Sequence, residues 1–165
     1  KKLKDLRRGL GTSTLRMISE PNAGGSSVNS EAISLEMMQA VFGAELWKLE
    51  TEVKYDMEGS IADYIVECFD RRVGVSVTRA MKYHGGPSMF TREDARSLLT
   101  KKLLGLQSAT ACVAPEHRWG LNILHIWSET DGVADTLHDV LRGLDRRLWE
   151  RTIILSTVTN KLVSL

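Results

Sequence analysis

The chain has 165 residues, of which 42% are hydrophobic and 26% are charged. This composition is ordinary for a globular domain and argues against a wholly disordered chain, a collagen-like chain and a coiled coil. The 22 Lys and Arg residues nearly balance the 21 Asp and Glu residues, and the net charge of +1 gives no global attraction to nucleic acid or to an anionic membrane.

The apolar residues and the cysteines indicate where the protein works. No run approaches the roughly 20 apolar residues of a membrane-spanning helix, so we expect a soluble protein without a membrane span. Cys68 and Cys112 are too few for a disulfide scaffold and predict two reduced, buried thiols. We therefore expect an intracellular protein, in the nucleus, the cytoplasm or an organelle.

The amino-terminal stretch is basic and differs from the rest of the chain. Over residues 1–16 the cations face a single acid, Asp5, and leucines recur at helical spacing, which predicts a short basic amphipathic helix. Such a helix could contact RNA, a partner or a membrane surface, end a transit peptide, or be an exposed arm without a task. Residues 21–27 are typical of a linker. We therefore predict a basic, flexible arm over 1–29 and a single α/β domain over 30–165.

Hydrophobic periodicity predicts the elements of this domain. In chain order they are a helix over 30–42, strands over 46–55, 61–69 and 73–78, a helix over 91–106, a strand over 122–127, a helix over 130–144 and a strand from 152. The strict valine alternation of 73–78, next to the β-rich run 61–69, predicts an antiparallel hairpin in the middle of a mixed sheet.

This α-β-β-β-α-β order resembles the restriction-endonuclease-like, or PD-(D/E)XK, nuclease superfamily between about Ser30 and Trp127. The resemblance implies an α/β fold of three layers, with helices on both sides of a mixed sheet. In that superfamily an acid opens the second strand and an acid-x-Lys motif lies on the third. The acids bind Mg²⁺ or Mn²⁺, and the lysine positions or activates the attacking water.

The match to these motifs is partial. Asp63 stands where the resemblance places the acid of the second strand. The third strand has Ser76, Val77 and Thr78 where the acid-x-Lys motif belongs, so both the acid and the lysine are absent there. A two-residue turn at positions 70–71 would place Asp63 opposite Thr78.

Other residues could replace the missing groups. The same turn places Glu67 opposite Gly74, on the face of its strand that also carries Asp63, although about 13 Å away along the strand. Glu36, on the first helix, is a second candidate acid. Candidate cations are Lys82, after the third strand, and Lys101 and Lys102 on the next helix. The resemblance thus implies Asp63, Glu36 and Glu67 as candidate metal ligands, and Lys82 and Lys101 as candidate catalytic residues.

Three further patterns are weaker. The histidines lack metal-ligand spacing, and His125, inside an apolar strand, indicates a hydrogen-bonded core histidine. The arginines of 142–151 recur near one predicted helix face, typical of a phosphate-binding stripe or of a salt-bridged solvent face. Residues 152–165 are rich in apolar side chains, so an uncovered edge strand there could join copies of the chain or bind a partner.

Two functions are consistent with these patterns. Because Ser76 and Thr78 replace the acid and the lysine, the sequence favours a nuclease-fold protein that is catalytically degenerate. Such a protein would serve as a nucleic-acid-binding subunit, for DNA or RNA, or as a subunit of a protein complex, through the basic arm and the stripe. The alternative is an active nuclease that hydrolyses phosphodiester bonds with Mg²⁺ or Mn²⁺ and uses Asp63 as a metal ligand. No cofactor is expected otherwise.

Overall fold

The computed structural model describes residues 9–20, 27–82 and 87–159. Five strands form one sheet in the order β1-β2-β3-β4-β5. The strands are β1 (Glu45–Leu49), β2 (Tyr64–Cys68), β3 (Arg71–Ala80), β4 (Leu121–Ser128) and β5 (Thr152–Val158). β2 runs antiparallel to both of its neighbours, β1 and β3, whereas β3, β4 and β5 are parallel, so the sheet is mixed.

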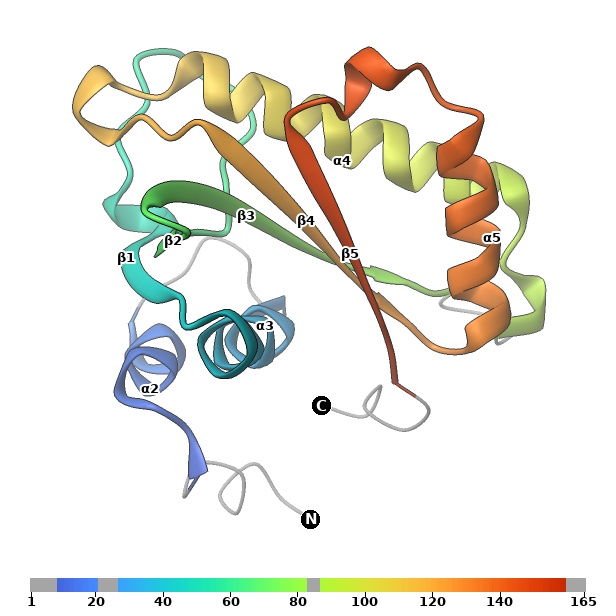
Figure 1. Cartoon of the computed structure of the whole chain (residues 1–165), viewed down its shortest axis with the longest axis horizontal. Coiled ribbons are helices and arrows are strands. Elements are labelled where there is room, and N and C mark those ends of the chain that lie inside the picture. Colours follow the sequence, from blue (N-terminus) through green and yellow to red (C-terminus); the bar gives the residue numbers. More distant parts are fainter. Residues whose placement is uncertain (1–8, 21–26, 83–86, 160–165) are drawn as a thin grey trace.

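Helices cover both faces of this sheet (Figure 1). The helices are α2 (Thr12–Ser19), α3 (Val28–Phe42), α4 (Arg92–Cys112) and α5 (Asp131–Arg142). Short 3₁₀ turns lie between the larger elements: η3 (Glu50–Glu52), η4 (Pro87–Met89), η5 (Pro115–His117) and η6 (Arg146–Leu148). α2 and α3 pack on one face, and α4 and α5 pack on the other. The predicted α/β class with a mixed sheet is confirmed.

The first strand ends earlier than the predicted range 46–55. β1 stops at Leu49, whose backbone N–H donates to a carboxylate oxygen of Glu52 over 2.8 Å. This bond turns the chain into η3 and buries Glu50, which is 8% exposed. The partial alternation of the sequence therefore described a short strand followed by a turn.

The predicted hairpin of β2 and β3 is present, but its turn lies one residue earlier than expected. Cys68 pairs with Arg71, so Phe69 and Asp70 form the turn, with φ angles of 54° and 57°. A two-residue type I′ turn requires positive φ at both positions. The Phe69 ring packs edge-on against Phe42, with centroids 6.1 Å apart, and this contact offsets part of the unfavourable left-handed conformation.

The earlier turn changes the register that the sequence predicted. Glu67 pairs with Arg72 instead of Gly74. The N–H of Asp63 donates to the carbonyl of Val75, so Asp63 lies two positions earlier along β3 than expected. A shift by two residues keeps each side chain on its predicted face, which is why the valine alternation could not reveal it.

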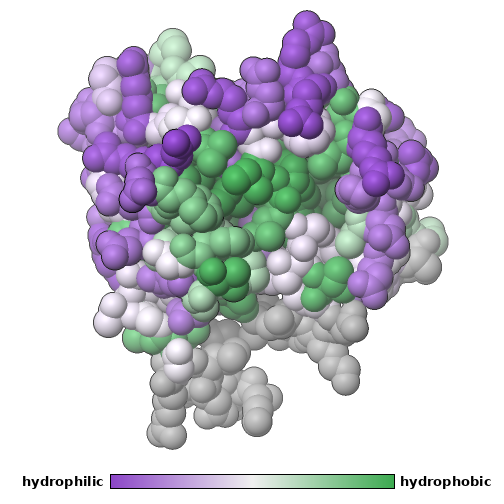
Figure 2. Space-filling view, in the orientation of Figure 1, coloured by the Kyte–Doolittle hydropathy of each residue, from purple (hydrophilic) through white to green (hydrophobic). Residues whose placement is uncertain are grey.

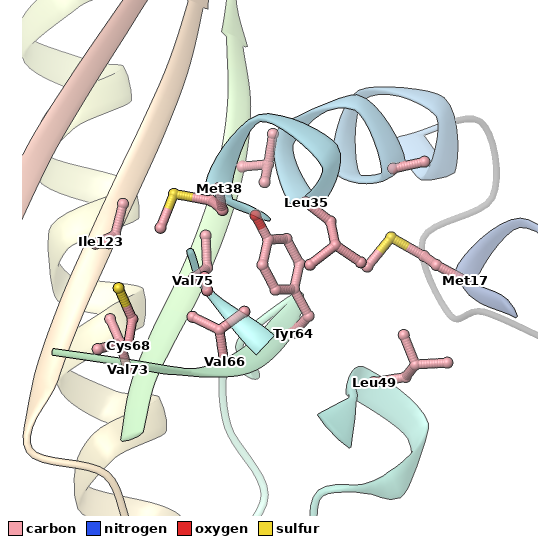
Figure 3. Packing of buried hydrophobic residues seen from close by; sticks show 13 residues of the cluster. Met17, Leu35, Met38, Leu49, Tyr64, Val66, Cys68, Val73, Val75 and Ile123 are labelled. Atoms are coloured by element: carbon pink, nitrogen blue, oxygen red, sulfur yellow. The ribbon is translucent and has the colours of Figure 1, made fainter. Parts of the chain in front are cut away.

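The valines of β3 face α3, where the first core cluster forms. Figure 3 shows this cluster, with the Tyr64 ring beside Leu35 and its oxygen directed toward α3. Met17 of α2 belongs to the same cluster and is 4% exposed. The alternate residues of β3, among them Ser76, face the opposite layer, where α4 lies. Because β2 begins only at Tyr64, which pairs with Val75, no strand of the described residues lies beside the second half of β3 on that edge.

Part of the segment predicted as a flexible arm belongs to the core, because α2 packs on α3. Beyond Met17, Thr14 is fully buried, and its hydroxyl donates to the Glu36 carboxylate over 2.6 Å. The same carboxylate accepts the backbone N–H of Gly11 over 3.0 Å, so Glu36 holds the first turn of α2 on α3. Most of the predicted basic helix and of the linker (residues 1–8 and 21–26) lies outside the described residues.

The carboxy-terminal strand β5 is an edge of the sheet. Its Ile153 side chain is 45% exposed, and Figure 2 shows an apolar area in the middle of the face that β5 crosses in Figure 1. Residues 160–165 lie outside the described residues. The association of copies through this segment stays a prediction.

The arginine stripe predicted over 142–151 does not lie on one helix, because α5 ends at Arg142. Arg146 and Arg147 lie in η6 instead. Arg146 stacks on the Trp149 ring at 4.2 Å, and Arg147 pairs with Asp145 at 2.5 Å. The prediction of one continuous stripe is therefore wrong.

The two cysteines and the helices bear on the cellular expectations. Both cysteines are free thiols; Cys68 is buried, whereas Cys112 is only half-buried. Within residues 9–20, 27–82 and 87–159, no helix is long and apolar enough to cross a membrane.

Candidate functional site

Four of the five predicted site residues do not lie at a common site. Each is either engaged with another partner or exposed elsewhere. Glu36 holds α2, as described above, and Glu67 is exposed and pairs with Arg72 at 3.5 Å. Lys82 forms an ion pair with Asp94 at the start of α4, with 2.9 Å between Nζ and Oδ1. Lys101 is exposed on α4. The structure does not bring these four residues together with Asp63.

Asp63 lies directly before β2, half-buried under the second half of β3. Its Oδ2 accepts the backbone N–H of Val77 over 2.5 Å, and the Ser76 hydroxyl also hydrogen-bonds the carboxylate. Burial raises the pKa of Asp63; the Val77 N–H and the charge of Lys102 act in the opposite direction. Of the predicted site residues, Asp63 is thus the one whose charge interacts with a lysine of the next helix, and that lysine is Lys102.

Lys102 reaches from α4 to β3, at the position where the resemblance places the acid-x-Lys motif. Its Nζ lies 3.3 Å from the carbonyl oxygen of Val77 and 3.5 Å from Oγ of Ser76. The sequence pattern indicates that Lys102, and not Lys101, faces the sheet. Lys102 lies seven residues from both Ala95 and Ala109, which are fully buried, so it shares their helix face. Lys101 falls outside that stripe and is exposed.

Two further carboxylates, which the sequence analysis did not select, lie near Asp63. Glu31 of α3 is 4% exposed and Glu50 of η3 is 8% exposed. Burial, followed by the charges of Asp63 and Glu50, raises the pKa of Glu31 to about 7, against the opposing effects of a Ser27 hydrogen bond and of Lys102. We call Glu31, Glu50, Asp63 and Lys102 the carboxylate cluster.

A pocket of about 300 Å³ opens beside this cluster, along the part of β3 that β2 does not cover. Glu31 and Lys102 line it, together with Ser30 and Arg79. Asp63 does not line the pocket, but it holds the N–H of Val77, a residue that does. One buried acid, Glu31, and one lysine, Lys102, therefore line a space open to solvent.

The chemistry of the carboxylate cluster fits a hard divalent cation that shares its ligands with a substrate. Across the described part of the chain, no three His, Cys, Asp or Glu side chains are placed to hold one metal ion. Mg²⁺ is nevertheless usually bound by only one or two carboxylates, together with water and substrate phosphate oxygens. Glu31 and Asp63 supply two such carboxylates, and acids with perturbed pKa values beside a pocket are typical of functional sites.

A second polar cluster lies nearby, and its side chains form one continuous chain of hydrogen bonds. Thr157 donates its hydroxyl proton toward the sulfur of Met37 (3.8 Å), so it accepts from Nε2 of His125 (3.0 Å). Nδ1 of His125 then accepts from the Ser34 hydroxyl (2.7 Å), and Ser34 accepts from the Tyr64 hydroxyl (2.7 Å). Burial lowers the pKa of His125 to about 4, which keeps the ring neutral at pH 7. The predicted hydrogen-bonded core histidine is confirmed. We call Ser34, Tyr64, His125 and Thr157 the histidine cluster.

Comparison with known proteins adds one relative. The chain is similar to the AAC-rich mRNA clone AAC4 protein of Dictyostelium discoideum, with 37% identity over 144 residues. The alignment covers 84% of this chain and 21% of that protein, so the chain spans about a fifth of the length of this relative. No protein-family model and no solved structure matches the chain.

Proposed function

We propose that the protein is a metal-dependent phosphodiesterase acting on nucleic acid, with its centre at the carboxylate cluster. The observation that carries this proposal is the position of Lys102 beside Asp63, Ser76 and the pocket. The order of elements also supports it, because helix, three antiparallel strands, helix and parallel strand is the core order of the restriction-endonuclease-like superfamily that the sequence resembles.

Each group has a chemical task in this proposal. Glu31 and Asp63 would hold the divalent cation, which would supply positive charge to stabilise the charge that develops on a phosphate. Lys102 would take the role of the lysine that the superfamily has on the third strand, although it comes from the following helix. Two of its three N–H donors point to Val77 and Ser76. The third can therefore orient a water or a phosphate oxygen.

A second candidate function is nucleic-acid binding without cleavage. Ser76 favours it, because a neutral hydroxyl stands where the superfamily has a metal-binding acid. A hydroxyl is a weaker ligand for a hard cation than a carboxylate. In this case the pocket would bind the nucleic-acid backbone, either alone or as part of a protein complex.

Cleavage of labelled DNA and RNA in Mg²⁺ or Mn²⁺ tests the first function against the second. We expect cleavage by the wild-type chain and a loss of more than about 100-fold in Asp63→Asn, because the amide keeps the shape but loses the charge that holds the cation. Lys102→Met should also lose cleavage.

Two matched controls accompany these variants. Lys101→Met changes the exposed lysine next to Lys102, and Glu67→Gln changes an exposed acid of β2, the strand that begins directly after Asp63. Both should cleave like wild type. If the wild-type chain binds nucleic acid but cleaves none with either metal, the second function replaces the first.

A further inference from the structure

The pocket beside the carboxylate cluster holds an arginine in a fixed orientation. Nε of Arg79 donates to Oγ of Ser30 over 2.6 Å. The carbonyl of Ser30 accepts from the indole N–H of Trp127 over 3.3 Å. Arg79 and Trp127 face each other across the parallel pair of β3 and β4. Side chains of two neighbouring strands thus hydrogen-bond to Ser30 in the first turn of α3. These bonds fix the Nε edge of the Arg79 guanidinium.

Arg79 differs from the other arginines that the structure describes. Some of those lie within 4 Å of an acid: Arg16, Arg72, Arg92 and Arg147. Others have no such acid but are exposed: Arg71, Arg96, Arg118, Arg142, Arg146 and Arg151. Arg79 is half-buried at the pocket wall, and among the described residues its one hydrogen-bond partner is the neutral Ser30 hydroxyl. Within the described ranges, no carboxylate therefore lies within 4 Å of its positive charge.

The geometry of a guanidinium decides what such a group can bind. With Nε engaged, the two Nη groups remain as a planar pair of donors, which matches two oxygens of a phosphate. Lys102 lines the same pocket and adds a second positive charge. A nucleic-acid backbone carries one phosphate per nucleotide, so another phosphate follows the one that reacts, and a pocket of about 300 Å³ accommodates a group of that size.

We propose that Arg79 binds, through its Nη groups, the backbone phosphate next to the one at the carboxylate cluster, and that Ser30 sets its orientation. This proposal rests on the proposed function for the position of the reacting phosphate, but it concerns binding and not cleavage. Arg79 is therefore a residue for substrate binding, and Ser30 is a positioning residue.

Fluorescence anisotropy of labelled single-stranded DNA and RNA, without divalent metal and over a range of salt concentrations, tests this proposal. We expect Arg79→Gln to bind roughly tenfold more weakly or worse. The slope of log K against log salt should fall by about 0.7, the value for one lost phosphate contact on a single strand. Ser30→Ala keeps the charge but frees the guanidinium, so affinity should fall less and the salt slope should not change.

Arg71→Gln is the matched control, because Arg71 is an exposed arginine at the other end of β3. It should bind like wild type. If Arg79→Gln binds with wild-type affinity and salt slope, or if the wild-type chain binds neither nucleic acid, the proposal is overturned. If Arg79→Gln binds more weakly and with a smaller salt slope, but the wild-type chain cleaves nothing, the phosphate contact stands and only the catalytic function fails. Should Arg79→Gln not fold, the affinity of Ser30→Ala decides, with wild-type affinity overturning the proposal.

Discussion

The two polar clusters each include one residue of α3, Glu31 and Ser34, which lie within one turn of each other. The clusters differ in charge and in how completely their hydrogen bonds are satisfied. The histidine cluster, with Ser34, is neutral, and each donor in its chain has an acceptor. The carboxylate cluster, with Glu31, gathers three acids and one lysine beside an open pocket, where burial raises the pKa of Glu31 to about 7. Satisfied buried groups stabilise a fold, whereas buried like charges destabilise it. The difference indicates a structural role for the histidine cluster and supports the functional role that we propose for the carboxylate cluster.

The largest effect on stability should come from the histidine cluster. His125→Ala removes a fully buried ring and leaves Ser34 and Thr157 without their partner. We expect the free energy of unfolding to fall by about 3 kcal/mol or more, from lost packing and from two unsatisfied groups. Urea unfolding followed by tryptophan fluorescence at pH 7 measures this. A loss below about 1 kcal/mol would contradict the structural role of this cluster.

The carboxylate cluster should respond in the opposite direction. The folded-state pKa of Glu31, about 7, lies above its usual value of 4.5, so the folded protein holds a proton that the unfolded chain releases between these pH values. Glu31 therefore makes the fold less stable as pH rises from about 4.5 to 7. Glu31→Gln should be more stable than wild type by up to about 3 kcal/mol at pH 8, with a difference that vanishes near pH 4.5.

Unfolding of both proteins at pH 4.5, 6 and 8 measures this trend. Glu36→Gln is the control, because Glu36 is on the same helix but accepts two hydrogen bonds from α2. It should lose about 1 kcal/mol at pH 8. A loss of stability in Glu31→Gln at pH 8 would show that Glu31 is a structural residue.

The hairpin and the two clusters show which features could be predicted from the sequence and which could not. The alternation of β3 and the β-rich run before it were enough to predict the hairpin. The register was missed because Phe69 adopts a left-handed conformation, which is uncommon for a bulky residue. Asp63 could be chosen from the order of elements, and the helix phase of Ala95 and Ala109 could have selected Lys102 over Lys101. No local pattern places Glu31 and Glu50 together, because their approach depends on how α3 and the turn after β1 pack around β2.

A smaller effect should come from one end of the histidine cluster. Thr157→Val keeps the shape of the side chain but removes the acceptor of the His125 Nε2 proton. Because Thr157 is half-buried on the edge strand, we expect a loss of about 1 kcal/mol. The same substitution in the His125→Ala background is the comparison, because that background lacks the ring that Thr157 bonds, and urea unfolding measures both. Equal losses in the wild-type and His125→Ala backgrounds would mean that this hydrogen bond adds nothing.

The contrast between the clusters is tested most directly by calorimetric titration of Mn²⁺ into the wild-type chain, Asp63→Asn, Glu67→Gln and His125→Ala at pH 8, at a temperature where all four are folded. The account predicts that wild type, Glu67→Gln and His125→Ala bind the ion alike and that Asp63→Asn does not bind it. Absence of Mn²⁺ binding by the wild-type chain, or equal binding by Asp63→Asn, would contradict a functional role for the carboxylate cluster.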